Sequence, residues 1–161
     1  MRIWHKDLIK YLPRQQLLGQ WRECCCIAKN IKDNSTPNHM LVNKISDYSY
    51  LHFLKYSYMI LQEMRRRSYN ISENSVQQLS SNILSSTEKY AKVTECVSRN
   101  NLFENWHTPR YLTQCYFNLQ EKFDNGGIPE KEWMPVKSFF EKFIKKFSRK
   151  LFTFGTKCDI I

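Results

Sequence analysis

Glycine and proline are scarce in this chain, with four and five among 161 residues. Strict alternation of apolar and polar residues is rare as well, which disfavours β-strands as the main element. Apolar residues recur instead at spacings of three and four over long stretches, the spacing typical of amphipathic helices. Because 161 residues is the size of one ordinary domain, the sequence predicts an all-α fold: a single compact helical domain with several helices.

Long apolar runs are missing too. No stretch approaches the roughly 18 to 20 apolar residues needed to cross a bilayer. The N-terminus lacks the apolar segment of a secretion signal. We therefore expect a soluble, cytoplasmic protein with no membrane association.

Acidic residues are few relative to basic ones. Asp and Glu number 15 against 25 Lys and Arg, which gives a net charge of +10 and an isoelectric point near 9.4. Such an excess favours a polyanionic partner. Nucleic acid is the first candidate, which would place the protein at the nucleoid, and an anionic membrane surface is the second.

Paired metal-ligand spacings are also lacking. The six cysteines show no C-x2-C pairs with suitable partners, and the four histidines are scattered, so no metal site is expected. Reduced thiols fit an intracellular protein. The role of three adjacent cysteines, Cys24, Cys25 and Cys26, stays open.

Helix signals divide the chain. A first helix is expected to begin near Pro13 and bury one face through Ala28. The predicted second and third helices span 48–69, ending in three arginines, and 72–97, a polar stretch that we expect to be part loop. A further helix is expected to be capped by Thr108 and stopped by 125–127.

The last segment is basic and amphipathic. Residues 137–152 place phenylalanines on one side of a helix and most lysines on the other. We expect 131–161 to form a basic amphipathic C-terminal helix and tail, packed on the domain formed by 1–130. The simplest interpretation of the basic face is that it is solvated. The alternatives are that it contacts the DNA backbone, a membrane surface or a partner helix.

The predicted first helix has an unusual far side. Gln16, Gly19 and Glu23 line up opposite the apolar stripe, with Gln15 and Arg22 on the adjoining edge. A glycine in an exposed helix costs about 1 kcal/mol relative to alanine. Close approach of another molecule would explain it, and a solvated face with an incidental glycine is the simpler interpretation.

Several of these residues carry a resemblance. The stretch LPRQQLLGQWREC, the start MRIWH, the residues His39, Val42 and Asn43, and the stretch LHFLKYSYMILQEMRRRSYNI together resemble the pyrimidine-dimer DNA glycosylase family, and its bacterial branch most. The resemblance covers about the first 70 residues well and 108–130 loosely. In phage relatives a histidine stands at the position of Gln16 and an arginine at that of Cys26.

The resemblance implies a bifunctional glycosylase and AP lyase that acts on pyrimidine dimers. In this family the α-amine of the first residue attacks the sugar of the damaged nucleotide and forms an imine, and a glutamate matching Glu23 is the acid/base residue. An α-amine has a pKa of about 7.7 to 8.0, against about 10.4 for lysine, so it is the better nucleophile near neutral pH. Arg2 should block removal of the initiator methionine, which makes Met1 the expected nucleophile.

The resemblance also implies residues that hold the duplex. Arg2 and Arg22 match family arginines that contact phosphates. The other expected DNA-binding residues are Gln15, Gln16, His39 and Asn43. No cofactor is expected, because the imine supplies the electron sink. The expected partner of the protein, which is expected to be a monomer, is damaged double-stranded DNA.

A non-catalytic alternative uses the same charge. A degenerate relative, or an unrelated basic helical protein, would bind DNA through phosphates without needing Glu23 or the Met1 amine. The choice of lesion, whether a pyrimidine dimer, another damaged base or an abasic site, stays open from the sequence.

Overall fold

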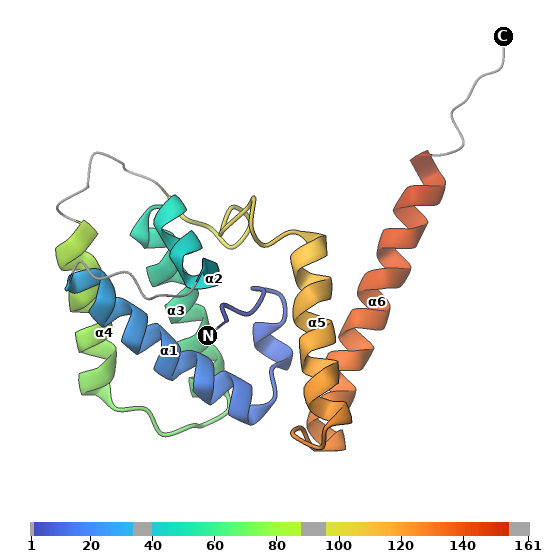
Figure 1. Ribbon diagram of the computed structural model, residues 1–161, viewed down its shortest axis with the longest axis horizontal. Helices are drawn as coiled ribbons and strands as arrows, with labels where there is room; N and C mark the ends of the chain where they lie inside the picture. The colour runs from blue at the N-terminus through green and yellow to red at the C-terminus, as the bar shows by residue number, and fades with distance from the viewer. Residues whose placement is uncertain (1, 34–39, 88–95, 155–161) are drawn as a thin grey trace, which may run out of the picture.

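The chain folds into helices joined by loops and an extended N-terminal segment (Figure 1). The computed structural model describes residues 2–33, 40–87 and 96–154. No strand occurs in these three ranges, which confirms the predicted all-α fold. The elements in chain order are η1 (Ile9–Tyr11), α1 (Arg14–Lys32), α2 (Met40–Asn43), η2 (Lys44–Asp47), α3 (Tyr50–Arg66), α4 (Glu73–Thr87), α5 (Pro109–Asp124) and α6 (Glu130–Phe154).

The signals at helix ends act much as the sequence predicts. Pro13 directly precedes α1 as its N-cap. The Thr108 hydroxyl accepts the backbone N–H of Tyr111 at 3.3 Å, which caps α5. After α5 the chain turns at Gly126, whose φ of 74° is a conformation that glycine adopts at little cost.

Two helix boundaries differ from the prediction. The polar helix α4 ends at Thr87, and Val97 lies outside any helix, while 88–95 fall outside the described residues. Helix α6 begins at Glu130, one residue before the expected start of the C-terminal helix and tail at 131. Pro135 lies in its second turn, where it removes only the backbone N–H that would reach the carbonyl of Lys131.

Helices α1, α3 and α4 pack together, and α5 and α6 run antiparallel beside them (Figure 1). The rings of Phe140 and Tyr116 stack with their centroids 3.8 Å apart, and those of Phe139 and Tyr11 stack at 4.5 Å. The Glu132 carboxylate accepts the backbone N–H of Arg14 at 2.6 Å, so α6 caps the start of α1. The C-terminal half of α6 extends past the other helices (Figure 1).

The N-terminal segment belongs to the core. Ile3 and Leu8 are fully buried, and Leu12 is 1% exposed. Figure 1 shows this segment between α1 and α5. Burying one large aliphatic side chain contributes roughly 1.5 to 3 kcal/mol to stability, so these three side chains hold residues 3–12 inside the fold.

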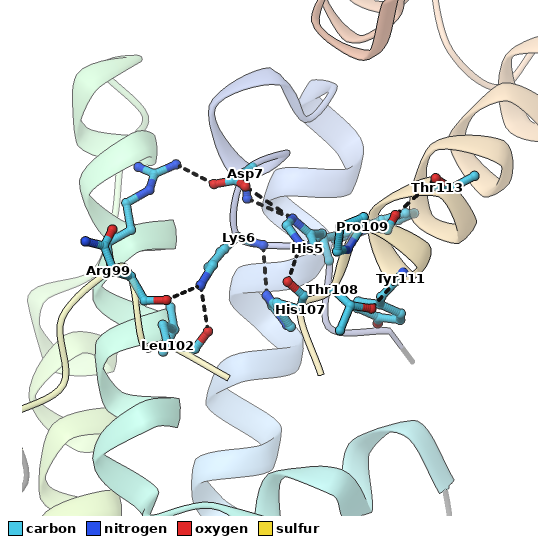
Figure 2. A network of polar contacts seen from close by, with 12 residues as sticks. His5, Lys6, Asp7, Arg99, Leu102, His107, Thr108, Pro109, Tyr111 and Thr113 are labelled. Atoms are coloured by element: carbon cyan, nitrogen blue, oxygen red, sulfur yellow. Dashed lines mark hydrogen bonds and ion pairs between the residues drawn. The ribbon is translucent and has the colours of Figure 1, made fainter. Parts of the chain in front are cut away.

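A polar network joins the N-terminal segment to the loop before α5 (Figure 2). The Lys6 ammonium donates to the carbonyls of Asn100 at 3.0 Å and Leu102 at 2.9 Å. The Lys6 backbone N–H donates to Nδ1 of His107 at 3.0 Å, and His5 Nε2 donates to the His107 carbonyl at 2.9 Å. His5 Nδ1 in turn accepts the backbone N–H of Asp7 at 3.2 Å. Each imidazole thus accepts a hydrogen bond at one ring nitrogen and is neutral, and burial lowers the pKa of each.

Acid should weaken the fold through His107. Burial and the neighbouring His5 and Lys6 lower its pKa to about 2, whereas the unfolded chain protonates near the ordinary value of about 6.5. Between pH 8 and pH 5 the unfolded state gains a proton that the folded state lacks, so the free energy of unfolding falls by about 2 kcal/mol through this residue. Urea unfolding of the wild type and of His107→Asn measures how much of the pH dependence of the free energy of unfolding comes from His107. The asparagine keeps an acceptor for the Lys6 N–H. Equal pH dependence of the two proteins would contradict it.

Candidate active site at the N-terminal segment

Two side chains of α1 hold the backbone of the N-terminal segment. The Glu23 carboxylate accepts the backbone N–H of Arg2, with Oε2 3.2 Å from the nitrogen. One turn earlier, the carboxamide oxygen of Gln20 accepts the backbone N–H of Trp4 at 3.1 Å. The Gln20 amide nitrogen lies 3.5 Å from the same Glu23 oxygen, at the outer limit of a hydrogen bond. The segment and the carboxylate are thus fixed relative to each other.

Two tyrosines hold the same segment by its carbonyls. The Tyr111 phenol, from α5, donates to the carbonyl of Ile3 at 2.6 Å. The Tyr56 phenol, from α3, donates to the carbonyl of Trp4 at 2.9 Å. Burial raises the pKa of both phenols above the ordinary value, so both remain donors at any physiological pH.

The surface beside Glu23 is open. Glu23 is partly exposed, and Arg22 next to it points to solvent. A methyl group added at Gly19 would meet no other atom of the described protein within 4 Å. The protein's own packing therefore does not require a glycine there, and the helix surface one turn before Glu23 is accessible to a large ligand.

The expected DNA-binding residues lie in different environments. Gln15, Arg22 and Asn43 are exposed, and the first two lie on the outer face of α1. Gln16 is partly buried, and its side-chain oxygen has no hydrogen-bond partner in the described part of the chain. It lines a hollow of about 370 Å³ with Lys122 and other residues at the end of α5. Met1 and His39 lie outside the described residues.

Arg2 is placed next to Glu23 by its backbone, whereas its side chain packs on an aromatic ring. The guanidinium carbon lies 5.7 Å from the ring centroid of Trp4, within the range of a cation–π contact. The side chain is partly exposed. The guanidinium therefore remains accessible to an anion approaching the open side of Glu23.

The arginines at the end of α3 have partners within the protein. Arg66 and Arg67 both donate to the Glu63 carboxylate, at 2.7 and 2.6 Å. Arg67 also donates to the carbonyls of Leu12 at 2.7 Å and Lys10 at 2.9 Å. These contacts tie the end of α3 to the residues before α1, which gives Arg67 a structural role.

The thiols of Cys24 and Cys25 are poorly suited to nucleophilic chemistry. Burial raises the pKa of Cys24 to about 12 and that of Cys25 to about 11, so both remain protonated near neutral pH. The cysteines of the described ranges are not joined in disulfides. No group of three or more His, Cys, Asp or Glu residues in those ranges is arranged to hold a metal ion.

Sequence reasoning missed the residues that fix the N-terminal segment. Gln20 is 1% exposed and lies on the face of α1 that apolar spacing assigns to the core. A lone amide on such a face is a usable signal, because a buried amide must find hydrogen-bond partners. Tyr56 and Tyr111 gave no such signal, since tyrosines at core positions are common and their partners lie far away in the sequence.

Comparison with known proteins finds one family model that matches the part of the chain containing this site. Residues 1–76 match the family model described as pyrimidine dimer DNA glycosylase. No curated protein and no solved structure matches the chain. The matched range includes α1, α3 and the N-terminal segment between them and α5. Separately, no helix in the described ranges is long and apolar enough to span a bilayer.

Removing the Tyr111 hydroxyl should destabilise the fold by leaving the Ile3 carbonyl without its partner. We expect Tyr111→Phe to lower the free energy of unfolding by about 1 to 3 kcal/mol, the usual penalty for an unsatisfied buried polar group. Tyr116→Phe is the matched control in the same helix, because no hydrogen bond of the Tyr116 phenol is found within the described residues and its ring stacking is kept. Urea unfolding compares the two variants, and an equal loss in both would refute the role of Tyr111.

Proposed function

We propose that the protein is a DNA-repair enzyme, a glycosylase with AP lyase activity that acts on ultraviolet-induced pyrimidine dimers, because residues 1–76 match the family model for pyrimidine dimer DNA glycosylases. The observation that carries the proposal is the 3.2 Å contact between the Glu23 carboxylate and the Arg2 backbone N–H. It supports an acid/base group beside the start of the chain, where the family places its chemistry.

The proposed nucleophile is the α-amine of a chain that begins at Met1. Its lone pair attacks C1′ of the damaged nucleotide, the N-glycosidic bond breaks, and the base leaves with the bonding electrons. Loss of the amine proton and opening of the sugar ring at O4′ give an imine. The imine acidifies the C2′ hydrogen, and its removal expels the 3′-phosphate by β-elimination. No cofactor takes part.

Glu23 is the proposed proton carrier in these steps. Covalent geometry keeps the Met1 amine within about 4 Å of the Arg2 nitrogen, because three bonds separate the two atoms. The carboxylate that accepts the Arg2 N–H is therefore within reach of the amine, directly or through one water. It takes a proton from the amine as the imine forms and protonates O4′ as the ring opens.

The proposed DNA contacts surround this centre. Arg2 and Arg22 hold phosphates beside the lesion, and Gln15 and Gln16 lie on the same side of α1. His39 and Asn43 are proposed to contact the duplex from the α1–α2 connection and α2. The partner is damaged double-stranded DNA, bound by a monomer. A non-catalytic DNA-binding protein is the alternative, and it would bind the same duplex without cutting it.

Glu23→Gln tests the acid/base role while keeping the fold. The amide oxygen still accepts the Arg2 N–H, but the side chain no longer carries protons, so we expect nicking of ultraviolet-irradiated supercoiled DNA to fall by about 10²- to 10⁴-fold. Glu104→Gln, which removes an exposed carboxylate before α5, is the control and should nick normally. Normal nicking by Glu23→Gln would refute the assignment. Salt-sensitive binding by a wild type that does not nick would favour the non-catalytic alternative.

Extension of the chain ahead of Met1 tests the nucleophile. Adding two residues, Gly-Ser, moves the α-amine away from Glu23 and replaces it with an amide nitrogen that is not nucleophilic. We expect loss of nicking, with thermal unfolding and duplex binding unchanged. A protein cleaved back to Met1 by a protease is the control and should recover activity. A fully active extended protein would overturn the choice of Met1.

A further inference from the structure

A second basic surface lies apart from the candidate active site, at the start of α1, whereas Glu23 lies near the middle of that helix. It is a groove of about 400 Å³ between η1, the start of α1, the end of α3 and the start of α6. Five cationic side chains line it, against one carboxylate, that of Glu132. The cations are Lys10, Arg14, Arg66, Arg67 and Lys131.

The charges of this groove divide into two groups. Arg66 and Arg67 share the Glu63 carboxylate, so their charge is largely compensated. Lys10, Arg14 and Lys131 are exposed, and within the described ranges no carboxylate lies within ion-pair distance of their charged groups. These three come from η1, α1 and α6, so the fold gathers uncompensated positive charge from three elements at one place. A groove with apolar walls concentrates the resulting field.

Aromatic rings lie beneath two of these cations. The Lys10 ammonium is 5.9 Å from the ring centroid of Tyr11, and the Arg14 guanidinium carbon is 5.4 Å from that of Tyr69. Contacts of this kind hold the stems of the side chains while their charged heads remain accessible. The groove is thus lined by partly ordered cations rather than by freely moving ones.

We propose that this groove binds the phosphodiester backbone of DNA beside the site where Glu23 acts. The proposal rests on the proposed function in one respect, the choice of DNA as the polyanion. Arg14 and Glu23 lie on opposite edges of the exposed face of α1, with Gln15 and Arg22 between them. A duplex whose axis runs parallel to α1 on this face contacts both edges.

The distance along α1 sets the register. Arg14 precedes Glu23 by about 14 Å at 1.5 Å per residue. One DNA strand advances 3.4 Å per nucleotide, so the groove meets phosphates about four nucleotides from the damaged base. Binding there is insensitive to base sequence, because only phosphates are contacted.

The test is the salt dependence of binding by Lys10→Gln/Lys131→Gln. With undamaged duplexes carrying about twelve base pairs on each side of the centre, each lost phosphate contact lowers the slope of log K against log salt by about 0.9. We expect the double variant to lose about 1.8 from the slope.

Lys32→Gln/Lys55→Gln is the matched control. It removes the same charge from two exposed positions outside the groove. Its slope of log K against log salt should equal that of the wild type on the same duplexes. Thermal unfolding establishes that both double variants fold. Equal salt-dependence slopes for the two double variants would overturn the proposal. So would loss of binding to phosphatidylserine vesicles by the groove variant with DNA binding intact.

Binding to undamaged DNA separates this proposal from the proposed function. A wild type that never nicks irradiated DNA, together with the expected loss of slope in the groove variant, would refute the proposed enzymatic function and support the DNA contact of the groove. Nicking by the wild type with an unchanged slope in the groove variant would support the proposed enzymatic function and refute the DNA contact of the groove.

Discussion

The burial of an extended N-terminal segment is the constraint on which the structure depends. Backbone groups buried outside helices and sheets have no regular partners, and each unsatisfied group costs free energy. Here side chains supply the partners: Glu23 and Gln20 accept from the N–H groups of Arg2 and Trp4, while two tyrosines donate to carbonyls. These side chains come from α1, α3 and α5, so the position of the chain start depends on how three helices pack. The proposed chemistry, in which the terminal amine attacks the sugar, requires residues 2–4 to be held in this way beside Glu23.

The large positive charge of the chain serves two purposes. Lys6 and Arg67 direct their charges to backbone carbonyls and thereby hold loops and helix ends together. Lys10, Arg14 and Arg22 instead face solvent. The attraction for a polyanion thus arises from the second group, which lies around α1. Glu23 is an acidic residue at the edge of this basic surface, and the proposed function assigns the proton-carrying role to its carboxylate.

Periodicity and end signals in the sequence predict the helices well, because they act over a few residues. The apolar spacing of α1 and the Thr108 cap are examples. The approach of Glu23 to Arg2 has no such local signal, and only the resemblance to a family indicated it. The links from Lys6 to His107 and from Tyr111 to Ile3 join residues about 100 positions apart, so no local pattern predicts them.

The measurement that tests the central claim most directly is a borohydride trap on the untagged protein with ultraviolet-irradiated duplex DNA, followed by mass mapping of the covalent adduct. An imine between the terminal amine and the sugar is reduced to a stable amine. The account predicts an adduct on the Met1 amine that is absent with undamaged DNA and is lost in Glu23→Gln. An adduct on a lysine side chain, or no adduct from a protein that binds the duplex, would contradict it.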